Sequence, residues 1–367
     1  MKRDVLSAAA GRDPATRISV EALTNFTARI LHARGVGGAD ADAVAAVLVA
    51  SDVRGISSHG VARLPYYVAM IEAGTIEPHA KPIVARESAT TAVLDARNGL
   101  GQPVGIQAMA LAIEKAADHD MGIVTVRHSN HYGIAGYYAM MALERDMIGV
   151  SVTNTHPAVA PTGGSRPTIG TNPIAIAVPT GESLPFVLDM ASSAVPRGRL
   201  EVAARQGTTL PIGWALDAHG APTTSPEAGL AGALLPLGGS LLTSGYKGYG
   251  LAVAIEMLAA VLPGSLYGPL VAPMWDTAGP SDLGQFFMAI NIAAFDDPTA
   301  FKARASDLLH RLKASPTAEG ESEILVAGEK EERAAEEARR HGIALDPVVR
   351  TQLAELAARY DVPPLPV

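Results

Sequence analysis

The sequence predicts a mixed α/β fold, in which a mixed sheet flanked by helices follows a smaller helical unit. Residues 18–85 carry mainly helical patterns. Strand-like runs and helical periodicity then mix over residues 86–299 without strict β-α-β alternation, so we expect no purely parallel sheet. A chain of 367 residues, 48% of them hydrophobic, can bury a sizeable core and form two domains that share one cleft.

Helices open the ordered part of the chain. Ser19 is suited to cap a first helix, because apolar residues recur at helical spacing from Leu23 to Ile30. A second helix is expected from about residue 39 until Gly55, a typical helix-ending residue. The next helix is expected to carry residues 66–71. Together they predict a small helical unit.

Runs rich in β-branched and aromatic residues, bounded by turn residues, predict the strands of the sheet. These strands cover residues 91–95, 122–126, 148–153, 174–178, 186–188 and 286–292. Further helices are expected at residues 105–119, 248–262, 329–340 and 347–360. Glu336 and Arg340 are one of several opposite-charge pairs four residues apart that indicate a solvated helix. Asp346, followed by proline, is expected to cap the last helix.

Composition and charge exclude several classes of protein. The formal net charge of −8 argues against a nucleic-acid partner, because phosphate binding depends on clusters of Lys and Arg. The chain has no cysteine, which excludes disulfides and thiolate chemistry and fits a reducing cytoplasm. The longest charge-free segments contain proline and glycine, so we expect no membrane span. Residues 1–17 hold an apolar run too short for a secretory signal and are expected to form a disordered extension.

The strongest candidate site is the segment 57–63, with Tyr67 shortly after it. It places the hydroxyl of Ser58, the imidazole of His59 and the guanidinium of Arg63 within one or two turns. An imidazole with a pKa near ~6.5 can give or take a proton at neutral pH, and a guanidinium binds a carboxylate through two parallel hydrogen bonds. The hydroxyl can hold the ring in one tautomer. This set suits hydride transfer at a carbonyl carbon beside a carboxylate.

The chain lacks the glycine fingerprint of a doubly wound dinucleotide-binding fold, which is G-x-G-x-x-G directly after a strand. Gly99 and Gly101 have no third glycine at the right spacing. The glycines of segment 245–250 alternate with bulky aromatic residues where the backbone must approach phosphate. The P-loop pattern is absent as well. A nicotinamide cofactor would therefore need a binding site of another kind.

A second polar segment, residues 128–136, follows the predicted strand 122–126 and leads into a glycine-flanked helix start. Such a position is suited to receive an anion or a cofactor. His128, His131 and His156 could also bind a metal, but no H-E-x-x-H pattern or carboxylate at ligand spacing supports it, and we expect none. The remaining alternative is that these histidines only solvate a strand end.

Three further candidates each have a plainer alternative. Asp189 ends a strand and could bind ribose hydroxyls, or it could cap the next helix. Lys247, at a predicted helix start, could pair with phosphate or be a solvated loop lysine. The turn sequence 170–173 could contribute to a site or merely connect two strands.

Taken together, these motifs resemble one family, the non-Rossmann malate/L-lactate dehydrogenases. They are Ser58-His59-Gly60 with Arg63 and Tyr67, His131-Tyr132-Gly133, Gly170-Thr171-Asn172-Pro173, Leu188-Asp189-Met190 and Lys247-Gly248-Tyr249-Gly250-Leu251. The family includes ureidoglycolate, sulfolactate and diketogulonate oxidoreductases and cyclic-imine carboxylate reductases. The match runs in order from about residue 18 to about residue 360.

The resemblance implies an NAD(P)-dependent oxidoreductase that acts on a small carboxylic acid and forms a homodimer. It implies a helical domain built from both chain ends, residues 18–85 and 300–367, around a mixed α/β cofactor domain of non-Rossmann type over residues 86–299. NAD is favoured over NADP, and both stay open.

The resemblance also implies roles for individual residues. His59 is the expected proton donor and acceptor with Ser58 as its hydroxyl partner, and His131 is the second candidate. The substrate is expected to contact Arg63, Tyr67 and Thr171. The expected cofactor contacts are Tyr132, Gly133, Ile134, Ala135, Gly136, Asp189, Met190, Ala191, Gly328 and Glu329, and the residue pattern adds Lys247 as a candidate for phosphate.

Two segments depart from the pattern. After the Asp-Met strand the family has Ala-Arg-Gly-Lys, whereas this chain has Val-Pro-Arg-Gly-Arg at residues 195–199. Imine-reducing members carry an acidic residue at the position of Arg199, so its absence favours an oxo or hydroxy acid over a cyclic imino acid. A binding protein without turnover is the third alternative. The Pro- and Gly-rich segment 265–282 is expected to shape the pocket or an interface.

Overall fold

The computed structural model describes residues 17–366, so the expected extension lies outside the described residues apart from Arg17. Arg17 is not part of an unstructured tail. It belongs to β1 (Arg17–Ile18), which pairs antiparallel with β12 (Ile343–Ala344). This two-stranded sheet joins segments from the two ends of the chain.

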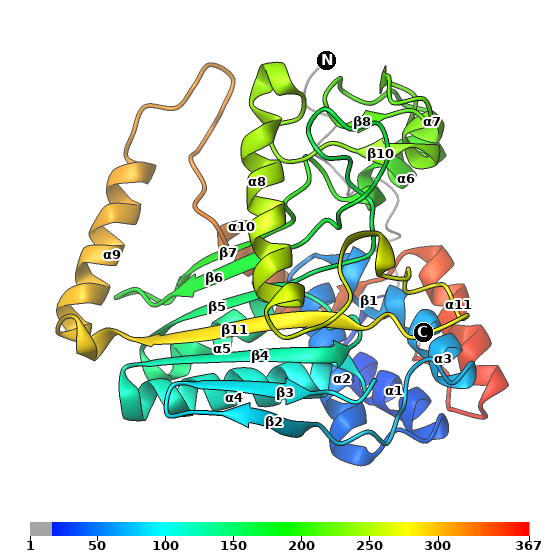
Figure 1. The fold of residues 1–367 in the computed structure, drawn as a ribbon, viewed down its shortest axis with the longest axis horizontal. Helices are drawn as coiled ribbons and strands as arrows, with labels where there is room; N and C mark the ends of the chain where they lie inside the picture. Colours follow the sequence, from blue (N-terminus) through cyan, green and yellow to red (C-terminus); the bar gives the residue numbers. More distant parts are fainter. Residues whose placement is uncertain (1–16, 367) are drawn as a thin grey trace.

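A seven-stranded mixed sheet forms the centre of the molecule, in the order β2-β3-β4-β11-β5-β6-β7 (Figure 1). Its strands are β2 (Ile83–Glu87), β3 (Thr91–Asp95), β4 (Met121–Ser129), β5 (Met147–Thr153), β6 (Ile174–Val178), β7 (Phe186–Met190) and β11 (Leu283–Asn291). β3 and β4 pair in parallel, and the other neighbours pair antiparallel. The predicted mixed α/β fold is confirmed.

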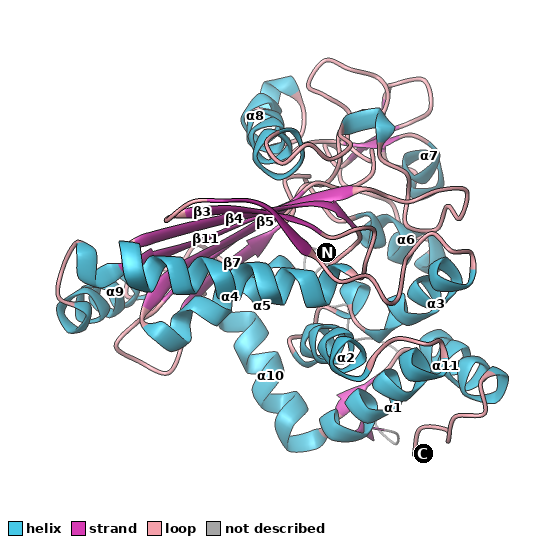
Figure 2. Ribbon diagram, turned by 60° about the horizontal axis from the view of Figure 1, so that its bottom comes forward, coloured by secondary structure: helices cyan, strands magenta, loops and turns pink. Residues whose placement is uncertain are grey.

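Helices cover both faces of this sheet (Figure 2). α4 (Gly101–His119) and α5 (Ala135–Met141) pack on one face. On the other face lies the end of α8 (Gly245–Glu256), which continues as a π-helical turn over Met257–Val261. The sequence placed the start of α4 four residues too late, because a proline such as Pro103 is tolerated in the first turn of a helix.

The alternation of strand residues between two cores is clearest in β11. Phe287 is fully buried in the core beneath α4 and α5, while its neighbour Phe286 enters the core beneath α8. Successive side chains of a strand point to opposite faces, so a strand buried on both sides needs apolar residues at consecutive positions.

The helical unit combines both ends of the chain in one hydrophobic cluster, which includes Leu23, Leu48, Leu64 and Leu353. Its helices are α1 (Val20–Ala33), α2 (Gly38–Val53), α3 (Leu64–Glu72) and α11 (Pro347–Arg359). The predicted caps are confirmed, because Ser19 accepts a hydrogen bond from the Ala22 N–H and Asp346 accepts one from the Val348 N–H.

Two helices of the C-terminal third lie in different places. α10 (Glu329–His341) contacts α2 of the helical unit. α9 (Pro298–Lys313) instead lies at the far end of the sheet (Figure 1), where the Lys302 carbonyl accepts a hydrogen bond from the Gly181 N–H. The predicted helical segment 300–367 therefore does not pack as a whole against the N-terminal helices.

A small unit beside α8 was not expected from the sequence. It contains β8 (Ala215–Leu216), β9 (Pro222–Thr223), β10 (Ala233–Leu234), α6 (Arg197–Gln206) and α7 (Pro226–Ala231). Strands of two residues are too short to show an alternating pattern. No helix in residues 17–366 has the length and apolarity needed to cross a membrane.

Candidate active site

The candidate site begins in the short connection between α2 and α3. Two 3-10 turns, η1 (Ser57–His59) and η2 (Val61–Arg63), fill this connection. The carboxylate of Asp52 accepts a hydrogen bond of 2.8 Å from the Val61 N–H, between the two turns. A Cβ at Gly60 would lie 2.2 Å from that carboxylate, so only glycine leaves room for this hydrogen bond, which anchors the turns.

His59 is a neutral, partly buried imidazole. Its Nδ1 lies 2.9 Å from the Ser58 Oγ, the contact expected from the sequence. Burial lowers the pKa of His59 from 6.5 to about 4, and the positive charge of Arg63 lowers it further in the same direction. The ring is therefore neutral at neutral pH, and a negative charge beside it would favour its protonated form.

Arg63 supplies a cation without an acidic partner. Its Nε donates a 2.7 Å hydrogen bond to the Ser58 carbonyl, and its guanidinium lies 5.6 Å from the centroid of the Tyr66 ring. No carboxylate within the described part of the chain forms an ion pair with it. The terminal nitrogens, one of which lies 4.0 Å from the Met274 sulfur, can therefore bind an anion.

His131 lies just beyond the end of β4 and contacts His59. Its ring stacks on that of His59, with 5.6 Å between the centroids and 23° between the planes. The hydroxyl oxygen of the buried Tyr67 lies 2.6 Å from its Nδ1. Burial, followed by the charges of His59, Arg63 and His156, keeps the pKa of His131 well below its usual value. The sequence motifs around His59 and His131 thus form one site.

The loop 265–282, expected to shape the pocket or an interface, contacts two residues of the site through Met274 and Trp275. His156 lies edge-on to Trp275, with 4.7 Å between ring centroids. Burial lowers the pKa of His156 to about 4, and the charges of Arg197 and Arg63 act in the same direction. The charge of Arg63 thus lowers the pKa of all three imidazoles, His59, His131 and His156, after the larger effect of burial.

His128 does not join the other histidines. Its Nδ1 lies 3.0 Å from a carboxylate oxygen of Asp95, which also accepts a 3.1 Å hydrogen bond from Arg127. Across residues 17–366, no group of three or more histidine or acidic side chains could hold a metal ion.

Asp189 caps a helix, though not the one expected. Its Oδ2 accepts a 2.8 Å hydrogen bond from the Gly136 N–H, so it caps α5, which precedes it in the chain, and not the helix that follows. A Cβ at Gly136 would lie 2.7 Å from this oxygen. Burial raises the pKa of Asp189 to about 6. Its other oxygen has no hydrogen-bond partner among the described residues and could accept one from a ribose hydroxyl.

The segment 132–136 offers backbone, not side chains, to a ligand. Tyr132 is buried and stacks on Tyr138, with 4.6 Å between the centroids, and Ile134 and Ala135 are buried as well. Gly133 has φ +87°, and a Cβ there would lie 2.7 Å from a methyl group of Val47. A cofactor could contact this segment mainly through the peptide groups of the turn.

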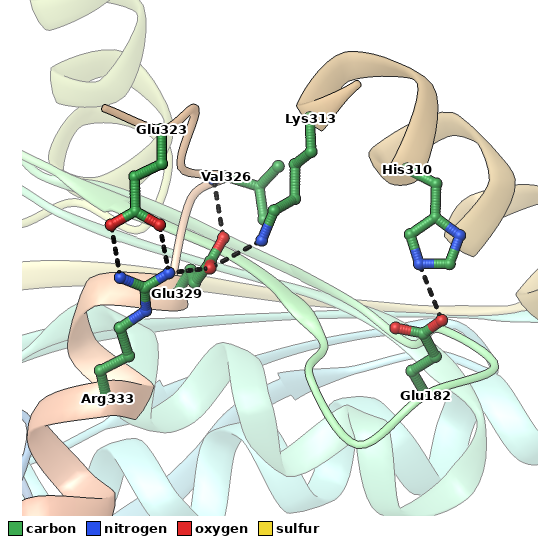
Figure 3. A network of polar contacts seen from close by, with 7 residues as sticks. All are labelled: Glu182, His310, Lys313, Glu323, Val326, Glu329 and Arg333. Carbon is green, nitrogen blue, oxygen red and sulfur yellow. Dashed lines mark hydrogen bonds and ion pairs between the residues drawn. The ribbon is translucent and has the colours of Figure 1, made fainter. Parts of the chain in front are cut away.

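The turn before α10 lies against β7, which brings Gly328 near the strand that ends in Met190 and leads to Ala191. The Val187 N–H donates a 3.1 Å hydrogen bond to the Ala327 carbonyl. The buried carboxylate of Glu329, however, is held by Lys313 at 2.7 Å and Arg333 at 2.6 Å (Figure 3). Burial would raise the pKa of Glu329, but these hydrogen bonds outweigh it, and the pKa is lowered.

Two predicted contacts lie on other elements. Lys247 is exposed near the start of α8, and the opposite end of this helix packs on the sheet (Figure 1). Lys247 forms no ion pair with any described residue. The Thr171 N–H donates a 2.9 Å hydrogen bond to the Oγ1 of Thr155, the neighbour of His156. Thr171 is thus linked to the site, whereas nothing in the described contacts links Lys247 to it.

Sequence reasoning missed several residues that build the site. Asp52 anchors the turn, Gln102 donates a 2.6 Å hydrogen bond to the Tyr67 hydroxyl, and Trp275 packs on His156. Gln102 could have been noticed as a polar residue just before an apolar helical pattern. Nothing local pairs Asp52 with Val61, because the contact depends on the path of the chain between them.

Residues 18–354 match the family model described as malate/L-lactate dehydrogenase. The chain is 45% identical to a malate dehydrogenase of Pyrococcus abyssi over 353 residues, which cover 96% of this chain and 97% of the relative. It is 43% identical to an L-sulfolactate dehydrogenase of Methanocaldococcus jannaschii, covering 89% and 92%. The solved malate dehydrogenase structure from Pyrococcus horikoshii superposes with a TM-score of 0.89 at 42% identity, covering 96% of this chain and 98% of that one.

Two more distant relatives broaden the comparison. A (2R)-3-sulfolactate dehydrogenase (NADP(+)) of Chromohalobacter salexigens is 34% identical, over 76% of this chain and 82% of its own length. A Delta(1)-pyrroline-2-carboxylate reductase of Ancylobacter novellus is 32% identical, over 95% and 99%. These similarities support an oxidoreductase, and the chain belongs to the malate/L-lactate dehydrogenase family.

Proposed function

We propose that this protein is an NAD(P)-dependent oxidoreductase that transfers a hydride between nicotinamide and a small 2-oxo or 2-hydroxy acid. The observation that supports this most directly is the unpaired guanidinium of Arg63 beside the stacked rings of His59 and His131. Such a set can bind a carboxylate and exchange a proton at the neighbouring oxygen. Malate and sulfolactate, the substrates in the relatives' names, both carry such a group.

In this proposal Arg63 binds the substrate carboxylate through its terminal nitrogens. Burial is the larger cause of the lowered pKa of His59 and the charge of Arg63 the smaller one; the bound anion offsets the smaller one, so a proton on the ring costs less. Ser58 then holds Nδ1, which leaves Nε2 to give a proton to the substrate oxygen or take one from it. A bound nicotinamide supplies or accepts the hydride.

The residues beside this set fit a nicotinamide cofactor. The free carboxylate oxygen of Asp189 could accept a ribose hydroxyl, and the peptide groups of 133–136 and Gly328 lie near it in the fold. Tyr132 and Glu329 are committed to the core and to ion pairs, so we assign them structural roles at the edge of this site. We propose NAD as the first cofactor to test, and NADP as the second because one relative's name specifies it.

The test is a panel assay of NADH and NADPH oxidation with oxaloacetate, pyruvate, sulfopyruvate, a diketosugar acid and a pyrroline carboxylate. Turnover of an oxo acid supports the proposal. The Delta(1)-pyrroline-2-carboxylate reductase relative makes a cyclic imino acid the second candidate substrate. Turnover of the pyrroline carboxylate alone would favour this second candidate. Silence across the panel would contradict both and favour a binding protein.

His59→Gln is the matching variant. It keeps a polar side chain but removes proton exchange, so kcat on the best substrate should fall about 10²–10⁴-fold. Turnover close to that of the unchanged protein would remove His59 from the mechanism and leave His131 as the candidate.

We also propose a cytoplasmic homodimer. Large apolar side chains are exposed on and beside α8, including Leu242 at 97% and Met257 at 59% exposure. A second copy would shield such a surface from water. Light scattering after gel filtration should give twice the chain mass of 37.9 kDa, and a monomer would contradict the proposal.

A further inference from the structure

Gln102 reaches the site from a helix to which no catalytic role has been assigned. Its side chain is fully buried at the start of α4, and its Nε2 donates a 2.6 Å hydrogen bond to the Tyr67 hydroxyl. The approach depends on Gly101, because a Cβ there would lie 2.3 Å from the Asn130 carbonyl oxygen. The backbone beside His131 and the start of α4 are thus held in direct contact.

The donors along this chain of contacts favour one direction. The Gly133 N–H points to the Nδ1 of His131 at 3.3 Å, a long contact that favours an unprotonated Nδ1 without fixing it. The Gln102 amide donates to the Tyr67 oxygen. The single hydroxyl proton of Tyr67 has two acceptors within reach, the Nδ1 of His131 at 2.6 Å and the His131 carbonyl at 3.4 Å. The shorter contact directs it to Nδ1, which puts the proton of the neutral ring on Nε2.

We propose that Gln102 is a positioning residue, which acts through Tyr67 to fix His131 as the Nε2–H tautomer. The Nε2 atom has no hydrogen-bond partner anywhere in residues 17–366, and its ring stacks on His59. This inference rests on the proposed function, in which both imidazoles face the substrate. His131 then donates a hydrogen bond to the substrate oxygen, while His59 exchanges the proton. Tyr67, predicted to bind substrate, is assigned to positioning because its hydroxyl is occupied on both sides.

The protonation states of the participants agree with this arrangement. Burial raises the pKa of Tyr67 above its usual value, so the phenol keeps its proton. Burial keeps the pKa of His131 low, so the ring is neutral and has one donor nitrogen. In the reverse chain a protonated Nδ1 would donate to the Tyr67 oxygen, the phenol proton would be left with the His131 carbonyl at 3.4 Å, and the Gly133 N–H would lose its acceptor.

The tautomer can be measured directly in the resting protein, without substrate. Nitrogen-15 labelling of histidine, with detection of two-bond couplings in the ring, distinguishes protonated from unprotonated nitrogens. The signals of His131 are identified by their loss in His131→Asn. We expect a protonated Nε2 and an unprotonated Nδ1. A protonated Nδ1 in the unchanged protein would overturn the inference, whatever the result of the substrate panel.

Gln102→Met tests whether Gln102 causes the preference for the Nε2–H tautomer of His131. If Gln102→Met does not fold, Tyr67→Phe is the second variant. Both should give ring signals that indicate a mixture of tautomers, with kcat about tenfold lower and KM little changed, the loss expected for about one hydrogen bond. Gln285→Met is the matched control, because Gln285 is an equally buried amide that donates to Ser129 and Asn130 and not to Tyr67. An unaltered tautomer and kcat in both test variants would remove Gln102 from this role.

Discussion

Arg63 combines two effects in the proposed reaction. Its Nε is held by the Ser58 carbonyl, which orients the terminal nitrogens as a fork. Its charge also lowers the pKa of His59, His131 and His156. A substrate anion would therefore bind the guanidinium and offset one of the causes that lower these three pKa values, although burial is the larger cause.

Replacing Arg63 with lysine should separate charge from geometry. Lysine keeps the positive charge but cannot form two parallel hydrogen bonds to a carboxylate. The loss of one charged hydrogen bond should raise KM for the oxo acid about tenfold or more, as measured by initial-rate kinetics. Arg86→Lys, on the exposed strand β2, is the control and should leave KM unchanged. Equal KM values for the Arg63 variant and the control would argue against a carboxylate at this residue.

At the scale of elements, the site depends on the two 3-10 turns between α2 and α3. They hold His59 and Arg63 four residues apart on a segment anchored by Asp52. The connection is short because Gly55, with φ +74°, ends α2 in a left-handed conformation. The positions of the functional groups therefore follow from one glycine and one buried carboxylate.

Gly60→Ala should break this anchor. The new methyl group would lie 2.2 Å from the Asp52 carboxylate, and overpacking of this kind costs about 1–3 kcal/mol. We expect a lower melting temperature together with a lower kcat/KM, because the turn must move. Gly250→Ala on α8, where a Cβ meets nothing within 4 Å, is the control and should be neutral or slightly stabilising. An unaltered Gly60 variant would show that the turn does not depend on this contact.

A second set of elements is joined by the ion pairs around Glu329 (Figure 3). Lys313 ends α9, Glu323 lies in the following loop, and Arg333 belongs to α10. Glu329→Gln should lower the melting temperature by a few degrees, because it removes the buried acceptor that both cations share. Glu336→Gln on the same helix, an exposed partner of Arg340, should change it little. Equal melting temperatures for both variants would mean that the buried ion pairs of Glu329 stabilise the fold no more than the exposed ion pair of Glu336.

Across the whole molecule, buried histidines link stability to pH. The pKa values of His59, His131 and His156 are lowered, so the unfolded chain binds more protons than the folded one below about pH 6.5. Asp189 and Asp282 oppose this, because burial raises the pKa of both carboxyls, that of Asp189 to about 6, and the folded state therefore binds their protons first. Three histidines outnumber these two carboxyls, so stability should fall as the pH decreases from 6.5 toward 4.

Thermal unfolding at several pH values between 4 and 7 measures this effect. His156→Gln should reduce the slope, because it removes one of the three depressed groups. His79→Gln, an exposed histidine, should leave the slope as it was. A melting temperature that is constant across this range, or that rises on acidification, would contradict the assignment of three neutral imidazoles.

The sequence by itself determined the strands and the longer helices, because their periodicity is a local property. Strands 91–95 and 174–178 have the predicted bounds, and Ser19 and Asp346 cap the helices they were expected to cap. The motifs also placed His59, Arg63 and His131 in one site. Each of these inferences depends on neighbouring residues or on the resemblance to one family.

Only the tertiary structure decided which partners those residues meet. Asp189 caps a helix that precedes it in the chain, Glu329 is occupied by two cations, and Gln102 reaches Tyr67. These contacts join residues from different strands, helices and loops. The packing of elements around a mixed sheet brings such residues within hydrogen-bond distance, and no local sequence pattern encodes which ones will meet.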